Sequence, residues 1–494
     1  MTELVRREAA LTLGTSAEIH PGSVFTDLGL DSLMAVELRR ALATATGVTL
    51  PATAVFDHPT PAGLAAYLGA SLRDHGAADT GRTARVERVA RRDVHPATEG
   101  QRRLWFLEQM RPGTAEYNVT MPVRLPRPLD RAAFTAAVAH VVRRHEALRT
   151  GLESPGGDLV QVVHDTVPTP LRFEEVATAG ELAGRVRDEA ATPFGLSGPV
   201  LLRCLVLTAP DEQVLCLTLH HAVIDAWSTV MVLNELFATY EEFRAGREPG
   251  ASDAPLHLGD YAGWERDAVA RGAFADGLGF FRDQLSGAPR LALPDATPGS
   301  QAEKAGFTLP ATLRGELETL AAEAGVTLYT VLAGAFSVLL SRYSEQRDFS
   351  IGTVWSGRGL ASSAEIIGFL ANTLPLRCDL TADPNVTELL AALRSRVLGV
   401  MEHQNVPLSE VLKVADVPRN GEENPLFRAV FNYGLGAEPD DGTWQPYAGA
   451  FTGNVAGTAK FELTMSLAPD RGPSAGSWSS SHTSWTGKPP AAWP

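Results

Sequence analysis

Apolar positions recur at helical spacing in the first 70 residues, over residues 4–13, 33–42 and 62–68. Loops marked by proline and glycine separate these stretches. Helices this short bury their apolar faces only by packing together. The pattern therefore predicts a small all-α bundle of three or four helices over residues 1–70.

The pattern changes after this bundle. Residues 71–93 have no apolar periodicity and are rich in Arg, Ala, Gly and Asp, which predicts a flexible linker. A mixed α/β pattern follows over 94–287, with a hairpin at 200–207 and 214–219 and helices at 131–144 and 228–244. Prolines over 286–304 mark a connection to a second α/β unit at 288–468, with helices at 313–324 and 329–343 and a strand at 349–355.

Composition limits the partners of the chain. Its 494 residues suffice for about three folding units. The formal net charge of −15 argues against a binder of nucleic acid or of anionic membranes, because such a protein needs a basic face. The apolar stretch at 328–340 is too short to span a bilayer, and the N-terminus has no signal pattern. We therefore expect a cytoplasmic protein.

The three cysteines, Cys204, Cys216 and Cys378, have no metal-ligand spacing, so we predict no metal site. They lie in apolar stretches, which predicts small buried residues. A sparse and odd number of cysteines suits a reducing compartment.

The string LHHAVIDAWS at 219–228 is the strongest candidate for chemistry. A buried strand ends in His220 and His221, Asp225 follows four residues later, and a long helix pattern begins near Trp227. This order places a titratable base at the end of a rigid element, as acyltransferases require. The alternative is a surface histidine pair followed by an aspartate that caps a helix.

HHAVIDAWS resembles the HHxxxDGWS motif of the condensation domains of nonribosomal peptide synthetases, which are related to chloramphenicol acetyltransferase. Other stretches resemble further motifs of this family in the right order. They are TEGQRRLWFLEQM at 98–110, RRHEALRTGL at 143–152, GDYAGWE at 259–265, IGFLANTLPLR at 367–377, EHQNVPLSEVL at 402–412 and NPLFRAVFNY at 424–433. The resemblance implies a two-lobed α/β condensation domain with the histidine motif between the lobes.

The resemblance also implies roles for single residues. His221 is the group that takes the proton of an attacking amine, or orients that amine, and His220 packs beneath the loop. Asp225 holds the shape of the loop by pairing with a cation, for which Arg358 in SGRGL is the candidate. Asn432 lies where the family has an active-site asparagine.

Two departures from the family pattern stand out. Ala226 replaces the usual glycine of the motif, which is costly only if the position needs a positive φ. Trp227 and Ser228 keep the form typical of domains that accept an L-configured or polyketide donor.

The second departure is at the C-terminal end. KFELTMSL at 460–467 fits the family, whereas residues 469–494 are rich in Ser, Gly, Pro and Trp. We therefore expect a low-complexity tail in place of the last strand and helix, a bare sheet edge and a truncated second lobe.

The N-terminal bundle has its own candidate site. FTDLGLDSL at 25–33 puts Gly29 in a turn and Ser32 at the first turn of the next helix, where the backbone N–H groups and the helix dipole favour a phosphate. The alternative is that Asp31 and Ser32 only cap this helix. The stretch from LGLDSL to AAYL resembles an acyl carrier protein of modular polyketide synthases. This implies that Ser32 carries covalent 4′-phosphopantetheine.

Together the two resemblances imply a carrier–condensation didomain of a hybrid polyketide/nonribosomal peptide synthetase that forms amide bonds. The expected partners are a phosphopantetheinyl transferase, an upstream polyketide or peptide synthase module, and a downstream aminoacyl carrier with its adenylation protein. The chain has no phosphate-binding GxxxxGK loop and no adenylation domain of its own. The alternative from another class is a loaded carrier whose truncated second domain only docks. An epimerisation domain would share the histidine motif, but the Asn-Thr of GFLANTLPLR fits the condensation form.

Overall fold

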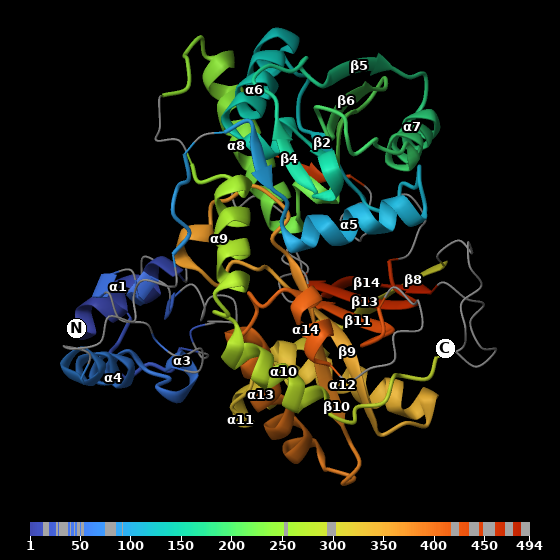
Figure 1. The fold of residues 1–494 in the computed structure, drawn as a ribbon. Coiled ribbons are helices and arrows are strands. Elements are labelled where there is room, and N and C mark those ends of the chain that lie inside the picture. The colour runs from blue at the N-terminus through green and yellow to red at the C-terminus, as the bar shows by residue number, and fades with distance from the viewer. Residues whose placement is uncertain are drawn as a thin grey trace.

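A computed structural model shows a helical N-terminal unit beside a two-lobed α/β domain (Figure 1). Its two lobes lie one above the other, with helix α5 (Glu99–Met110) across the region between them. The residues that the structure describes are 1–12, 19–25, 28, 38–39, 41–43, 45–46, 50, 54–74, 85–90, 92–250, 255–293, 303–415, 424–433, 444–447, 460–469 and 478–485.

The N-terminal unit is helical, as the sequence predicts. It contains α1 (Thr2–Thr12), α3 (Ala54–Asp57) and α4 (Pro61–Asp74). Their apolar faces meet in one core, which also includes Leu38 and Leu42 from the predicted second helix. Ser32 lies outside the described residues, so the structure gives no geometry for the predicted attachment site.

The prediction of a flexible linker over 71–93 is wrong at both ends. Helix α4 continues to Asp74, and residues 85–90, which we call the strap, lie on the two-lobed domain. Val86 is 1% exposed within the core of the N-terminal lobe, and its N–H donates to Ser362 Oγ at 2.8 Å. The N–H of Val89 donates to Asp260 Oδ1 at 2.8 Å. One apolar side chain and two backbone hydrogen bonds therefore fix this segment.

The N-terminal lobe contains a five-stranded sheet in the order β12-β2-β7-β6-β5. Its strands are β12 (Gln445–Pro446), β2 (Asn118–Leu125), β7 (Gln213–His220), β6 (Leu202–Thr208) and β5 (Leu171–Glu175). A smaller sheet has the order β1 (Val94–Pro96), β4 (Val160–Val163) and β3 (Thr150–Glu153). The predicted hairpin is β6 paired antiparallel with β7.

The helices of this lobe begin where side-chain caps are available. Asp130 accepts the N–H groups of Ala132 and Ala133, so α6 starts at Arg131 as predicted. The helices are α6 (Arg131–Arg144), α7 (Ala179–Ala191), α8 (Ala226–Arg244) and α9 (Leu258–Ala270). Short 3-10 turns lie at Glu146–Arg149, Pro155–Gly157 and His221–Val223.

The C-terminal lobe contains a six-stranded sheet in the order β10-β9-β11-β13-β14-β8. Its strands are β10 (Asn372–Asp379), β9 (Asp348–Trp355), β11 (Ala429–Tyr433), β13 (Leu463–Pro469), β14 (Trp478–Trp485) and β8 (Glu303–Leu309). Its helices are α10 (Ala275–Leu285), α11 (Ala311–Glu323), α12 (Leu328–Ser344), α13 (Val386–Glu402) and α14 (Leu408–Val414). A 3-10 turn lies at Ala361–Ser363.

The expectation of a bare sheet edge after β13 is wrong. Residues 478–485, within the segment predicted to be a low-complexity tail, form β14. This strand pairs antiparallel with β13 on one side and with β8 on the other. Both neighbours therefore satisfy backbone groups that an open edge would leave to solvent.

The two lobes are not separate in space. β12 and the buried side chain of Trp444 come from the C-terminal half of the sequence but belong to the sheet and core of the N-terminal lobe. Leu360, Ile366 and Leu370 join the same core. These crossing segments bring the connection between β9 and β10 to the N-terminal lobe, beside the histidine motif.

The three cysteines are buried free thiols, as the sequence predicts.

Among the described residues, no single helix has the length and apolar character needed to cross a membrane. Only α11 and α12 counted together pass that test, and they are bent by 105° at their junction.

Candidate active site

The histidine motif lies at the end of an interior strand. β7 is hydrogen-bonded to β2 on one side and to β6 on the other, and all its residues after Gln213 are buried. His220 is its last residue, His221 begins a single 3-10 turn, and α8 starts at Ala226. The motif is therefore fixed by regular elements on both sides, which keeps its side chains in one geometry.

The orientation of the His221 ring follows from its hydrogen bonds. Its backbone N–H donates to Tyr117 O at 2.8 Å, and its Nδ1 lies 2.8 Å from Ile224 O. A carbonyl oxygen only accepts, so Nδ1 carries the proton and Nε2 keeps its lone pair. The ring meets the Phe369 ring at a centroid distance of 4.6 Å. Burial and the charge of Lys460 lower the pKa of His221 to about 3, so its imidazole is neutral at pH 7.

His220 lies beneath the loop, in the packed position that the family resemblance implies. It is 2% exposed, and its Nδ1 accepts the N–H of Ala222 at 3.1 Å. The Phe194 ring and the Tyr117 ring lie at centroid distances of 6.3 Å and 6.5 Å. Burial, with the charge of Lys460, lowers the pKa of His220 to about 3.

Asp225 and Arg358 form a buried ion pair. Arg358 Nη1 lies 2.8 Å from Asp225 Oδ2, and both side chains are at most 2% exposed. The N–H groups of Leu370 and Ala371 donate to the same oxygen at 3.0 and 3.1 Å. Burial alone would raise the pKa of Asp225, but the charge and hydrogen bond of Arg358 hold that pKa below its usual value.

Asp225 also caps α8, because its Oδ1 accepts the Ser228 N–H at 2.8 Å. The capping interpretation and the ion-pair interpretation therefore both describe this side chain. Ser228 Oγ accepts from Arg358 Nη2 at 2.6 Å and from the Gly368 N–H at 3.1 Å. These bonds join the start of α8 to the connection between β9 and β10.

The substitution of the motif glycine is harmless. Ala226 is the first residue of α8 and is not among the described non-glycine residues with positive φ, which are Glu345 and Asp383. Its methyl group therefore causes no backbone strain.

Asn432 lies apart from this group. It is on β11 in the sheet of the C-terminal lobe, opposite Ser466 of β13. Within the part of the chain that the structure describes, no hydrogen bond links its side chain to the loop 220–225. The structure thus brings together His220, His221, Asp225, Ser228 and Arg358, and leaves the role of Asn432 a prediction.

Several residues at the site were not predicted from the sequence. Gln101 is fully buried, and its Nε2 donates to Ala222 O at 3.0 Å, which supports the 3-10 turn from below. A detectable signal existed, since Thr98 and Gln101 have capping-box spacing and form that box in α5. Tyr117, Phe369 and Lys460 had no local signal, because they come from distant segments.

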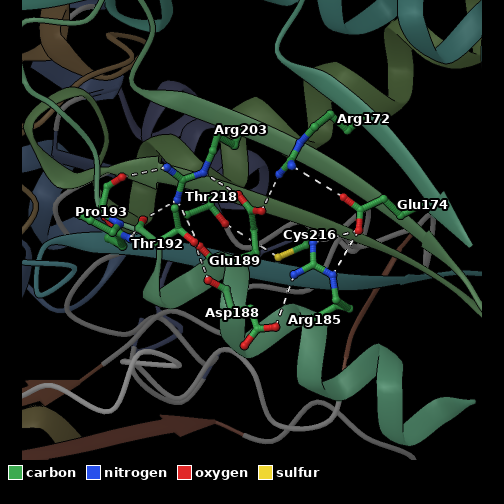
Figure 2. Close-up of polar contacts among 11 residues, drawn as sticks. Arg172, Glu174, Arg185, Asp188, Glu189, Thr192, Pro193, Arg203, Cys216 and Thr218 are labelled. Atoms are coloured by element: carbon green, nitrogen blue, oxygen red, sulfur yellow. Dashed lines mark hydrogen bonds and ion pairs between the residues drawn. The ribbon is translucent and has the colours of Figure 1, made fainter. Parts of the chain in front are cut away.

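An ion-pair network holds the segment that covers His220. Figure 2 shows Glu189, near the end of α7, facing Arg172 of β5 and Arg203 of β6. Glu189 is 4% exposed and pairs with Arg172 at 2.6 Å and with Arg203 at 2.5 Å. Arg203 also donates to Thr192 O, and its guanidinium lies 3.8 Å from the Phe194 ring centroid. Phe194 in turn contacts His220.

The comparison with known families agrees with this geometry. The family model of the condensation domain matches residues 91–474, which is most of the chain. The chain belongs to the condensation-domain family. Condensation domains of nonribosomal peptide synthetases are acyltransferases that form amide bonds. The phosphopantetheine attachment site family matches residues 3–68, so the N-terminal unit is a carrier domain, which implies covalently bound 4′-phosphopantetheine.

Relatives among curated proteins are large synthetases. The chain is 34% identical over 420 residues to a linear gramicidin synthase protein of Brevibacillus parabrevis, covering 82% of this chain and 5% of that protein. Tyrocidine synthase 3 of the same organism is 33% identical over 416 residues, covering 82% of this chain and 6% of that protein. The chain thus spans less than a tenth of the length of these relatives.

Solved structures share the fold. The X-domain from teicoplanin biosynthesis, in its complex with OxyB, has a TM-score of 0.69 at 25% identity and covers 81% of this chain and 89% of that domain. The condensation domain of the Monacolin K polyketide synthase MokA has a TM-score of 0.68 at 20% identity, covering 79% and 92%. The two-lobed fold predicted from the sequence is therefore confirmed.

Proposed function

We propose that this chain is the carrier–condensation part of a hybrid polyketide/nonribosomal peptide synthetase and that its condensation domain forms an amide. The donor is an acyl thioester on Ser32 of the carrier domain, and the acceptor is an aminoacyl thioester on a downstream carrier. The geometry of His221 is the main support, because a neutral imidazole with its Nδ1–H bound to Ile224 O presents Nε2 as the proton acceptor.

The reaction needs one proton transfer that this residue can perform. The acceptor amine attacks the donor carbonyl, a C–N bond forms, and a C–S bond breaks. Nε2 of His221 takes the proton from the attacking nitrogen and returns it to the departing sulfur, which leaves as a thiol. The phosphopantetheine arm supplies the thioester linkage when it is attached to the carrier.

The proposed partners follow from the domains that this stretch of sequence contains. A phosphopantetheinyl transferase modifies Ser32, and an upstream polyketide or peptide synthase module supplies the acyl group. A downstream carrier with its adenylation protein supplies the amino acid. Natural products of the antibiotic or other secondary-metabolite type are the proposed output.

The test uses the full chain and a soluble acceptor. A phosphopantetheinyl transferase transfers octanoyl-phosphopantetheine from octanoyl-coenzyme A to Ser32, which releases adenosine 3′,5′-bisphosphate. Glycine is then added as an N-acetylcysteamine thioester. Mass spectrometry then measures the N-octanoyl-glycyl thioester. We expect product from the wild type and none from Ser32→Ala. His221→Ala should lower the rate by about 10²–10⁴-fold, the usual contribution of a general base. His140→Ala on α6 is the matched histidine control and should keep the wild-type rate.

A docking role is the second candidate. The X-domain, which shares this fold, was solved in a complex with another protein, OxyB. Full loading of Ser32 without any amide product, with no difference between the wild type and His221→Ala, would favour this role. Exchange of the α-proton of a carrier-bound peptide for deuterium would instead indicate epimerisation.

A further inference from the structure

Lys460 is a cation at the candidate site that the mechanism above does not use. It immediately precedes the segment that enters β13, and Phe461 beside it contacts Phe427 of the C-terminal lobe at a centroid distance of 5.9 Å. Yet Lys460 Nζ lies 5.5 Å from the centroid of the Tyr117 ring, which belongs to the N-terminal lobe. This side chain therefore reaches from one lobe to the other.

Tyr117 connects this cation to both histidines. Its carbonyl oxygen accepts the backbone N–H of His221 at 2.8 Å, and its ring lies 6.5 Å from the His220 ring. Tyr117 is 8% exposed, so the ring between the ammonium group and the His220 imidazole is largely shielded from solvent. Charges interact more strongly in such surroundings than in water.

The charged groups around His221 act in opposite directions. Lys460 is the nearby cation that disfavours a protonated imidazole, whereas Asp225 favours it. Asp225 is already paired with Arg358, which reduces its effect on the ring. Around Lys460 itself, burial lowers the pKa to about 8 and the charge of Glu116 raises it. Glu116 is in turn paired with Arg111 at 3.1 Å. Lys460 is therefore mostly charged at pH 7.

We propose that Lys460 is a positioning residue of the condensation site, whose ammonium group adds to the effect of burial in keeping His221 unprotonated and able to accept the proton of the attacking amine. This inference rests on the proposed function for its chemical meaning. Its electrostatic part concerns the folded chain alone and can be measured without any reaction.

The first experiment measures the ionisation of His221 directly. The full chain is labelled with ¹⁵N-histidine, and the imidazole signals are followed against pH by NMR, with His221 assigned from the His221→Gln spectrum. Lys460→Met removes the charge and keeps the length of the side chain, and Lys460→Arg keeps the charge. We expect the titration midpoint of His221 to rise by about one pH unit or more in Lys460→Met, given the interaction of charges several ångströms apart. Lys460→Arg should leave the midpoint in place.

A matched control removes a different lysine of the same lobe. Lys413 lies on α14, pairs with Glu410 and is mostly exposed, so Lys413→Met should not move the His221 signal. An unchanged midpoint in Lys460→Met would overturn the proposal. Lys460→Gln provides a second neutral variant if Lys460→Met does not fold.

The second experiment asks whether this electrostatic effect reaches the reaction. Single-turnover amide formation is measured from pH 4 to pH 8. In Lys460→Met the acid limb of the profile should move to higher pH, so that the loss of rate is largest at pH 4 and small at pH 8. A loss that is equal at every pH would mean a purely structural role and would overturn the proposal. If the wild type forms no amide, the proposed function fails, while the NMR midpoints still decide the electrostatic role of Lys460.

Discussion

The loop between β7 and α8 has two sides with different surroundings, which we call its two surfaces. On the Asp225 side, a buried carboxylate, a guanidinium, a hydroxyl and backbone groups bond to one another at 2.6–3.1 Å. On the His221 side the neighbours are the Phe369 ring, Tyr117 and the ammonium group of Lys460. The first surface fixes the loop, whereas the proposed proton transfer takes place at the second. Nearby residues thus divide the structural role from the proposed chemical one.

Among the variants considered, removal of the Arg358 charge should cause the largest loss of stability. Arg358→Met leaves the carboxylate of Asp225 buried at 1% exposure without its cation. We expect the free energy of unfolding to fall by about 3–5 kcal/mol, measured by urea unfolding. The double variant Asp225→Asn with Arg358→Met removes both charges and should recover part of the loss. A decrease below about 1 kcal/mol in the single variant would show that the pair does not fix the loop.

The two surfaces should lose their contributions to the free energy of unfolding at different pH values as the solution is acidified. The folded pKa of each motif imidazole is about 3, below the ordinary value of 6.5, so the unfolded chain binds more protons between these values. Stability from these imidazoles is therefore complete above pH 6.5 and is lost as the pH falls toward 3. Asp225, whose pKa is lowered from 3.8, loses its contribution only below about pH 4.

We expect each imidazole to cost on the order of 2 kcal/mol of unfolding free energy between pH 7 and pH 5. Glu265 acts in the opposite direction, because burial raises its pKa to about 8. Urea unfolding is measured for the wild type and for His220→Asn at pH 7 and pH 5. The difference between the two proteins removes the contribution of Glu265, which both share. Equal pH dependence in the two proteins would contradict the low pKa of His220.

The network in Figure 2 extends the fixed surface to the outer face of the lobe. Glu189→Gln weakens the ion pairs with Arg172 and Arg203, and we expect a loss of about 1–3 kcal/mol in unfolding free energy. Asp188→Asn changes the neighbouring carboxylate, which is 68% exposed. It should change stability by no more than about 0.5 kcal/mol. A similar loss of unfolding free energy in both variants would show that the ion pairs of Glu189 do not stabilise this lobe.

The smallest effect is expected at Ala226. Because this residue starts α8 without positive φ, Ala226→Gly restores the family glycine without relieving strain. The variant should lose less than about 1 kcal/mol from greater backbone freedom in the unfolded chain. A thermal melt measures this, and a clear gain in stability would show that the alanine is strained.

Local patterns predicted much of the fold. The helix at 131–144 and the hairpin before the histidine motif were predictable, because apolar periodicity and an Asp130 cap act within a few residues. β14 was not, since its polar, serine-rich sequence has no strand periodicity and pairs with strands far away in the chain. The strap was missed for a similar reason, because one buried valine gives no periodic signal.

The candidate site shows the same limit. The resemblance to condensation domains suggested that Arg358 faces Asp225, and the two side chains are in contact. Lys460 lies in the stretch KFELTMSL, which resembles the family, but the sequence does not reveal its proximity to Tyr117 in the other lobe. Contacts across a lobe boundary are set by tertiary structure, which a single sequence does not display.

The attachment of residues 85–90 to the two-lobed domain shortens the connection between that domain and the carrier domain. Ten residues, 75–84, separate the end of α4 from the strap, and even a fully stretched chain of that length spans at most about 35 Å. The carrier domain is therefore attached to the two-lobed domain beside Asp260 and Ser362, ahead of the start of β1. The end of α4 must therefore lie within about 35 Å of the strap, so the strap fixes the region of the two-lobed domain beside which the carrier domain lies.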